Sequence, residues 1–509
     1  MAAKHLPAGL LLLAAACGGA QRARPGPAAV PAASAPTARQ ALRAFVDSLV
    51  DAPEFRNAHW GVLVVDPERG DTLYSRNAGK LFLPASNQKL ITGAAALALL
   101  GPEFRFRTAV VRRGPVRGDT LAGDLVIVGR GDPSVSDHMR GDAMLPLRAA
   151  ADSLRARGIR VIEGRVLAGG DAFPDAPLGY GWAWDDLDEP YAAGVDELLF
   201  NEGFSRVHVR GGAAGAPVAA ETRPAAGIPV VVVEAATLDS ARPGAAGAEL
   251  TLAADPLRPT TARLGGSMRV GDTTTLEVTH RDPAGAYLAA LTQALTQRGV
   301  ATLGRLTAGG RDTARADTLF TMLSPTLAEI LPALEKPSQN QIAEVLYKTL
   351  GLERTGVGTA DSARAVVERQ LRAWGADSTG FVVRDGSGLS RHDYLSPETV
   401  VRVLDAARRA PWGRIFYDAL PIAGVDGTIA NRMRGTPAQG NVHAKTGYVD
   451  RARSLSGYVT TADGRTLLFS MLANNWTTPV KGVERVQDAV AARLASMRLD
   501  GAPAGVGGP

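Results

Sequence analysis

The most constraining feature of this 509-residue chain is an apolar segment that follows Pro84, Ala85 and Ser86. The segment runs to Leu100 as NQKLITGAAALALL and is apolar on almost every side when it is plotted at helical spacing. A helix without a polar face must be covered on all sides, so the segment predicts a helix at the centre of a large body. Ser86 then lies at the N-terminus of that helix.

The two ends of the folded chain predict an α/β body. Thr37 is expected to cap a helix that extends to about Val50, and segments 60–66 and 72–75 flank a turn as a β-hairpin. Strands are also predicted near the other end, at 442–447, 454–460 and 467–472, with a closing helix at 480–497. We therefore expect a sheet that is completed from both ends of the chain.

The middle of the chain has a different character. From about residue 103 to 321, short β-like runs such as 124–128 and 230–234 alternate with many Gly, Ala and Pro residues. This stretch is interpreted as a large insertion. Helical patterning is expected to return at Ser324, as an N-cap with Pro325 in the first helical position, and to continue from Gln341 to Leu350.

The N-terminal 17 residues have the layout of a secretory signal, with a cationic Lys4 and an apolar run before small residues and Cys17. Cys17 is the only cysteine, which excludes an internal disulfide. A lone cysteine at this place resembles the lipobox of bacterial lipoproteins, which implies lipidation of Cys17; an ordinary cleaved signal is the alternative. Residues 18–36, rich in Ala, Pro and Gly, predict a flexible linker.

Charge and composition narrow the classes of function. The 56 basic and 51 acidic residues nearly balance, and no Lys/Arg-rich run follows the pattern of a nucleic-acid binder, so we expect no nucleic-acid partner. The seven His residues form no close pair and no H-E-x-x-H motif, so no metal or other cofactor is expected. Only seven basic residues are Lys. Because this chain uses Arg for nearly all of its basic residues, a Lys indicates a task that requires the side chain to lose a proton, which Arg cannot do.

Three short motifs carry candidate chemistry. Ser86 and Lys89 are three residues apart at a helix start, so they share one face, and a desolvated amine there can take the serine proton. Ser338 and Asn340 follow Pro337 and precede a helix. The third motif, on a predicted strand, offers a cation and a hydroxyl to a carboxylate, and a glycine that lets a substrate backbone approach: Lys445, Thr446 and Gly447. Each motif alone is weak, since each also fits an N-cap or a surface lysine.

Together, Ser-x-x-Lys, Ser-x-Asn and Lys-Thr-Gly in this order resemble the signature of penicillin-binding proteins and class A β-lactamases. The first gap is 338 − 86 = 252 residues and the second is 445 − 338 = 107. The long first gap resembles the class C low-molecular-mass penicillin-binding proteins, which are D-alanyl-D-alanine carboxypeptidases/endopeptidases. The run from Tyr448 to Arg453 departs from the small Thr- and Ser-containing residues of that family, which affects substrate preference near the cleft.

The resemblance implies an α/β, penicillin-binding/β-lactamase-like transpeptidase fold, with helices on a mainly antiparallel sheet and a large β-rich inserted region. It also implies that Ser86 is the nucleophile, Lys89 its base and Ser338 a proton relay. Asn340 and the Lys445-Thr446-Gly447 motif would bind substrate. The oxyanion would lie between the backbone N–H groups of Ser86 and Tyr448.

The implied partners are peptidoglycan stem peptides ending in D-Ala-D-Ala, and β-lactam antibiotics as covalent inhibitors. The location is the exported cell envelope or periplasm, with a possible membrane tether through Cys17. Two alternatives stay open, namely a β-lactamase or esterase with the same machinery and a non-catalytic wall-binding lipoprotein. The expected division is signal 1–17, linker 18–36, peptidase domain 37–105 and 320–498, insertion 106–319, and a disordered tail 499–509.

Overall fold

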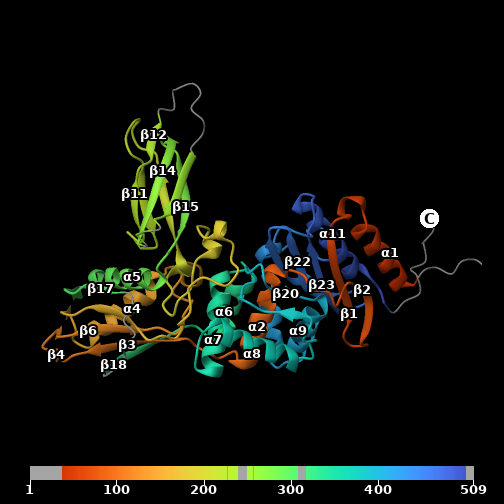
Figure 1. The fold of residues 1–509 in the computed structure, drawn as a ribbon, viewed down its shortest axis with the longest axis horizontal. Helices are drawn as coiled ribbons and strands as arrows, with labels where there is room; N and C mark the ends of the chain where they lie inside the picture. The colour runs from red at the N-terminus through yellow and green to blue at the C-terminus, as the bar shows by residue number, and fades with distance from the viewer. Residues whose placement is uncertain are drawn as a thin grey trace, which may run out of the picture.

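The computed structural model describes residues 37–499, apart from 226, 239–248, 256, 259 and 308–316. The predicted signal, Cys17, the linker 18–36 and the tail beyond Leu499 lie outside the described residues. Within them the chain forms an α/β body and a long inserted region on one side of it (Figure 1). None of the described helices is long and apolar enough to cross a membrane.

The body is built on a five-stranded antiparallel sheet that draws strands from both ends of the chain, as the sequence predicts. In spatial order the strands are β2 (Asp71–Arg76), β1 (His59–Asp66), β23 (Thr466–Asn474), β22 (Ala452–Thr460) and β21 (His443–Val449). The strand β21 forms one edge of this sheet. Segment 421–423 bonds to the start of β21, through the bridge between Ile422 and His443 and the bond from the Ala444 N–H to the Pro421 carbonyl. Only the later part of this edge can therefore receive a ligand backbone.

One face of the sheet is covered by α1 (Ala38–Val50) and α11 (Val480–Ser496), whose apolar side chains pack with those of the strands. The predicted cap of α1 is present. Thr37 Oγ1 accepts the N–H of Gln40, and the Gln40 side chain accepts the N–H of Thr37. This reciprocal pair satisfies two backbone donors that a helix start otherwise leaves open.

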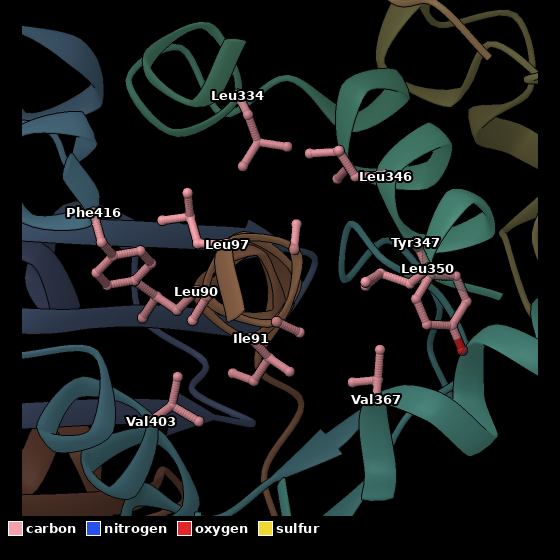
Figure 2. Close-up of a cluster of buried hydrophobic side chains, with 14 of the residues drawn as sticks. Leu90, Ile91, Leu97, Leu334, Leu346, Tyr347, Leu350, Val367, Val403 and Phe416 are labelled. Carbon is pink, nitrogen blue, oxygen red and sulfur yellow. The ribbon is translucent and has the colours of Figure 1, made fainter. Parts of the chain in front are cut away.

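The other face carries α2 (Gln88–Leu99), and every residue from 88 to 97 in it is buried. Figure 2 shows this helix end-on, with Leu90, Ile91 and Leu97 radiating toward side chains of the surrounding elements. Those elements are α6 (Leu327–Glu335), α7 (Asn340–Thr355), α8 (Ala360–Ala373), α9 (Pro397–Arg409) and α10 (Gly413–Ala419). The prediction of a helix covered on all sides is confirmed.

The predicted start of the next helix is wrong by two residues. The N-cap of α6 is Thr326, which forms a capping box with Glu329, rather than Ser324. Ser324 Oγ instead accepts the N–H of Phe106 at 2.8 Å and donates to the carbonyl of Pro325 at 2.6 Å. The helix begins at the T-x-x-E pattern because this pattern satisfies two backbone donors of the first turn, whereas a serine before proline satisfies fewer.

The inserted region begins and ends on neighbouring antiparallel strands, β3 (Arg107–Arg113) and β18 (Asp317–Leu323). These belong to a five-stranded sheet with β6 (Asp124–Val128), β8 (Val166–Gly169) and β17 (Leu306–Thr307). A second small sheet contains β4 (Val116–Arg117), β5 (Thr120–Leu121), β7 (Val161–Ile162) and β16 (Ala301–Thr302). Two helices that the sequence analysis missed, α4 (Met144–Ala156) and α5 (Pro283–Gln297), share a core with these sheets.

A further β module stands away from this unit in Figure 1 and has its own apolar core. Its strands are β9 (Phe204–Arg210), β10 (Ala219–Arg223), β11 (Val230–Val233), β12 (Ala236–Leu238), β13 (Glu249–Ala254), β14 (Thr261–Arg269) and β15 (Thr273–Thr279). The predicted strands at 124–128 and 230–234 are thus confirmed as β6 and β11, the second ending one residue early.

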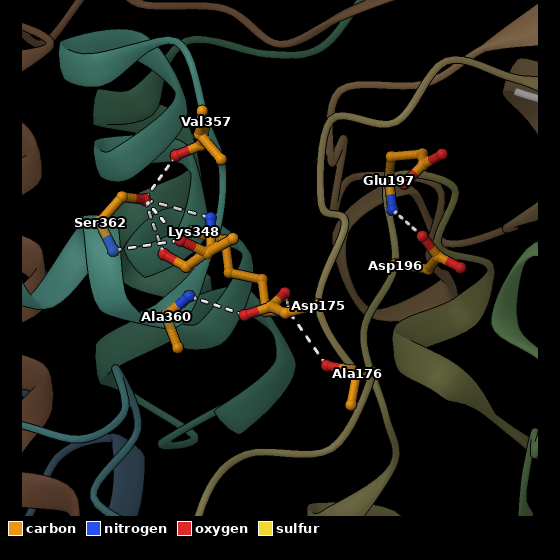
Figure 3. A network of polar contacts seen from close by, with 9 residues as sticks. Asp175, Ala176, Asp196, Glu197, Lys348, Val357, Ala360 and Ser362 are labelled. Carbon is orange, nitrogen blue, oxygen red and sulfur yellow. Dashed lines mark hydrogen bonds and ion pairs between the residues drawn. The ribbon is translucent and has the colours of Figure 1, made fainter.

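A buried ion pair fastens the inserted region to the body beside α7. Lys348, whose side chain is 6% exposed, pairs with Asp175 of the insertion and donates to the carbonyl of Ala176 at 3.1 Å. The second carboxylate oxygen of Asp175 accepts the N–H of Ala360, the first residue of α8, at 2.7 Å. Figure 3 shows Asp175 between these two partners. One carboxylate therefore joins two body helices to the insertion.

Candidate active site

Ser86 lies in a 3₁₀ turn, Ala85–Asn87, immediately before α2 rather than in the helix itself. Its neighbour Ala85 has a left-handed φ of 48°, a conformation that non-glycine residues adopt mainly where the surroundings enforce it. Two bonds to the central sheet hold the turn. Ser454 Oγ donates to the carbonyl of Pro84 at 2.8 Å, and Asn87 Nδ2 donates to the carbonyl of Lys445 at 2.8 Å.

Lys89 is fully buried and its ammonium is held by three acceptors. Its Nζ lies 2.8 Å from Ser86 Oγ, 2.5 Å from Asn340 Oδ1 and 2.8 Å from the carbonyl of Ser387. Burial lowers the pKa of Lys89 to about 8, against the attraction of four carboxylates, Asp385, Glu335, Glu344 and Asp393. An amine with this pKa is partly neutral near pH 7, and the neutral form can accept a proton from the serine.

The second motif is divided between two environments. Asn340 begins α7 and is 9% exposed, with Oδ1 on Lys89 and Nδ2 donating to the carbonyl of Tyr191 in the insertion at 2.7 Å. Ser338 is half-buried with a left-handed φ of 67°, and within the described chain its hydroxyl makes no hydrogen bond. The structure therefore brings Asn340 to Lys89, but it does not join Ser338 to Ser86.

Lys445, Thr446 and Gly447 lie on the edge strand β21. Because side chains alternate along a strand, Lys445 and Thr446 point to opposite faces. Lys445 is fully buried, and burial, followed by the charge of Lys89, holds the pKa of Lys445 well below its usual value. The Thr446 hydroxyl donates to Thr428 Oγ1 at 2.7 Å.

Gly447 packs closely against the turn that carries Ser86. A Cβ on Gly447 would lie 2.8 Å from the backbone N of Ser86 and 2.7 Å from the carbonyl of Pro84. The space that Gly447 leaves is occupied by the turn that carries Ser86, and the role of Gly447 in admitting a substrate backbone stays a prediction.

The unusual run after Gly447 places a guanidinium over an aromatic ring. The Tyr448 side chain is 54% exposed, and the guanidinium of Arg453 lies 5.5 Å from the centre of its ring. Arg453 is in turn paired with Glu484 of α11 at 2.5 Å. An aromatic ring and a cation thus stand where small hydroxyl side chains were expected.

Sequence reasoning missed a group of buried carboxyls behind Lys89. Glu344 Oε1 accepts the N–H groups of Gly386 and Ser387 at 3.1 and 2.8 Å, and burial raises the pKa of Glu344 to about 8. Asp385 accepts five hydrogen bonds, from the N–H groups of Ser387, Gly388 and Ser390, the hydroxyl of Ser387 and the indole N–H of Trp182. These bonds orient the Ser387 carbonyl toward Lys89. The sequence did contain one sign of this group, because Glu344 is an acidic residue within the otherwise largely apolar helical pattern of 341–350.

In the part of the chain that the structure describes, no three His, Cys, Asp or Glu side chains are arranged to hold a metal ion. The site as it stands offers a serine hydroxyl, a buried amine, a second hydroxyl and backbone donors, which suffice for acyl transfer to serine.

Comparison with known proteins agrees with this geometry. The family model of the D-Ala-D-Ala carboxypeptidase 3 (S13) family matches residues 42–497. The chain is 38% identical over 488 residues to a D-alanyl-D-alanine carboxypeptidase of an Actinomadura species, covering 91% of this chain and 86% of the relative. It is 27% identical over 453 residues to the D-alanyl-D-alanine carboxypeptidase DacB of Haemophilus influenzae, covering 84% and 87%.

A similar fold is found among solved structures. Penicillin binding protein 4 (dacB) from Haemophilus influenzae superposes with a TM-score of 0.77 at 23% identity, covering 89% of this chain and 99% of that one.

Proposed function

The chain belongs to the D-Ala-D-Ala carboxypeptidase 3 (S13) family, and from this premise we propose how its residues divide the work of a serine-type D-alanyl-D-alanine carboxypeptidase. The observation that carries the proposal is the 2.8 Å hydrogen bond between Lys89 Nζ and Ser86 Oγ in a fully buried setting. The expected α/β penicillin-binding fold and the family agree with the comparisons.

In the first step, Ser86 Oγ attacks the carbonyl carbon of the penultimate D-alanine and its proton passes to neutral Lys89. The backbone N–H groups of Ser86 and Tyr448 stabilise the oxyanion, as the close packing of β21 against the turn supports. Ser338 relays a proton to the leaving amine, so that free D-alanine departs. Water then attacks the acyl-enzyme ester, releases the shortened peptide and restores the Ser86 hydroxyl.

The side-chain amide of Asn340 has one N–H that can donate a hydrogen bond to the substrate. Its carboxamide nitrogen carries two hydrogens, of which one serves the Tyr191 carbonyl. We assign the second to a carbonyl of the substrate. Lys445, Thr446 and Gly447 form the wall against which the terminal carboxylate binds, and the Lys445 ammonium supplies the charge.

The same chemistry extends to related acyl donors. The bond of a peptidoglycan cross-link joins a D-alanine carbonyl to an amine, so its cleavage forms the same acyl-enzyme, and we include endopeptidase activity in the proposal. β-Lactams acylate the same serine. A β-lactamase would turn penicillin over rapidly, and a non-catalytic wall-binding protein would form no adduct with it. No feature of the described residues favours either alternative.

Location and domain division are also proposals. We place the mature protein in the cell envelope or periplasm, with Cys17 as a lipid anchor and 18–36 as its linker, because stem peptides lie outside the cytoplasm. The peptidase domain is assigned to 37–105 and 320–498 and the insertion to 106–319, which the pairing of β3 with β18 supports. In the assigned tail 499–509, Leu499 is described, and its N–H donates to Asp463 at 2.6 Å.

The experiment that tests the function follows release of the C-terminal alanine, D-alanine from a peptide ending in D-Ala-D-Ala and L-alanine from its D-Ala-L-Ala counterpart. We expect release from the first only. Equal release from both, or none from either, would contradict the assignment.

A further inference from the structure

Glu335, the last residue of α6, is a buried charge without an evident partner. It is 0% exposed, and within the described residues neither of its carboxylate oxygens has a hydrogen-bond partner. Buried polar groups are normally paired, and an isolated buried carboxylate is costly. The mechanism outlined above does not use this residue, so its placement requires an explanation.

The carboxyl occupies space that a glycine of α2 leaves free. A Cβ on Gly93 would lie 2.7 Å from Glu335 Oε1. Gly93 follows Lys89 by four residues on the same helix, so the two positions share one face and lie one turn apart. Glycine inside a helix is unfavourable. Here it leaves the space in which the Glu335 carboxyl sits beside the base.

Two buried lysines act on this carboxyl. Burial raises the pKa of Glu335 to about 7, while the charges of Lys445 and Lys89 oppose that rise. In return, Glu335 raises the pKa of both lysines against the effect of burial. Beside the carboxyl, α2 and β21 thus contribute two cations, and Glu335 is the carboxyl that acts on both.

The other charged groups near α6 are engaged elsewhere. Lys336 binds Asp426 and the carbonyl of Leu420, and Arg414 of α10 pairs with Asp418. In the short helix α3 (Asp137–Arg140), Arg140 binds Ser134 and His138 binds Glu202. On α7, Lys348 is paired with Asp175, while Glu344 binds backbone N–H groups and acts on Lys89 together with Asp385 and Asp393.

We propose that Glu335 is a positioning residue for acylation, a buried counter-charge shared by Lys89 and Lys445 that governs how readily Lys89 accepts the Ser86 proton. The inference rests on the proposed function, since it assigns Lys89 as the base. It does not make Glu335 a catalytic residue, because the carboxyl acts through the two amines.

The test is the pH profile of the second-order rate of acylation by penicillin. Glu335→Gln keeps the shape and removes the charge, so Lys89 loses its proton more easily and the acid limb moves down by about one pH unit, from about 8 toward about 7. Glu335→Asp keeps the charge and should stay nearer the wild-type midpoint. Glu329→Gln, an exposed position on the same helix, is the matched control and should not shift the profile.

A purely structural role predicts the reverse order, with isosteric Gln tolerated and shorter Asp impaired, and that result overturns the inference. Gly93→Ala provides a second route if Glu335→Gln fails to fold, because the added Cβ displaces the carboxyl, and it should shift the limb in the same direction. An unchanged midpoint in both variants also overturns the inference while leaving the function intact. Absence of acylation in the wild type would instead refute the proposed function.

Discussion

Replacing Lys89 and Lys445 by arginine, one at a time, separates their two assigned tasks. Lys89 has to lose a proton, whereas Lys445 has to remain a cation beside the substrate carboxylate. Arginine keeps the positive charge at either position but stays protonated at every pH of interest. The two variants should therefore fail to very different extents.

The size of the Lys89→Arg effect follows from the pKa of about 8 for Lys89. That value leaves about one-tenth of the amine neutral at pH 7, whereas a pKa above about 12 leaves less than about one part in 10⁵. The neutral fraction falls by roughly 10⁴, and a positioned general base contributes about 10²–10⁴ in rate. We expect acylation by penicillin and by peptide to fall by roughly 10³–10⁴.

Lys445→Arg should lose only part of the rate, roughly 10- to 100-fold, through misfit of a larger head group in a fully buried position. The assay is the second-order rate of penicillin acylation across pH. In the wild type this rate should rise about fivefold from pH 7 to 8 and level off above about 9. Equal losses in both variants, or near-normal acylation in Lys89→Arg, would refute this division of tasks.

Three further outcomes are expected. Ser86→Ala should abolish peptidase activity and change the free energy of unfolding by at most about 2 kcal/mol, because only one hydroxyl at a helix start is lost; a larger loss of stability would show a structural role instead. Cys17→Ser should move the protein from the detergent-soluble membrane fraction to a free exported one, and unchanged partitioning would indicate an ordinary signal. Lys348→Met should destabilise the fold by about 2 kcal/mol in urea, because it leaves the charge of Asp175 without its cation, whereas Lys481→Met, at a 77% exposed side chain, should change stability by less than about 0.5 kcal/mol.

Elements with strong local signals could be predicted from the sequence. The apolar run after Ser86 predicts a covered helix, and alternating strands near the C-terminus predict β21 to β23, because both patterns are set within a few residues. The missed helices α4 and α5 lie in a stretch whose many Gly, Ala and Pro residues mask the helical period. Their apolar faces are paired with strands far away in sequence.

In the site, too, contacts between residues close in sequence could be predicted, and contacts between distant segments could not. Ser86 and Lys89 are neighbours on one face, so their spacing alone predicts the contact that is observed at 2.8 Å. The placing of Asn340 on Lys89 depends on a segment 251 residues away. The family signature implied a substrate-binding role for Asn340, and nothing in the sequence indicated its contact with Lys89. The fit of Glu335 against Gly93 and the packing of Gly447 on the Ser86 turn involve distant backbone positions, and no local pattern specifies them.

The assignment of Ser86 as an acylated nucleophile is tested most directly by intact-mass analysis after incubation with penicillin. We expect the wild type to gain the mass of one penicillin molecule, to retain it through the measurement, and to carry it on the peptide that contains Ser86. Ser86→Ala should keep its unmodified mass. Labelling of Ser86→Ala, rapid return of the wild type to its free mass with hydrolysed penicillin accumulating, or no adduct at all would contradict the account.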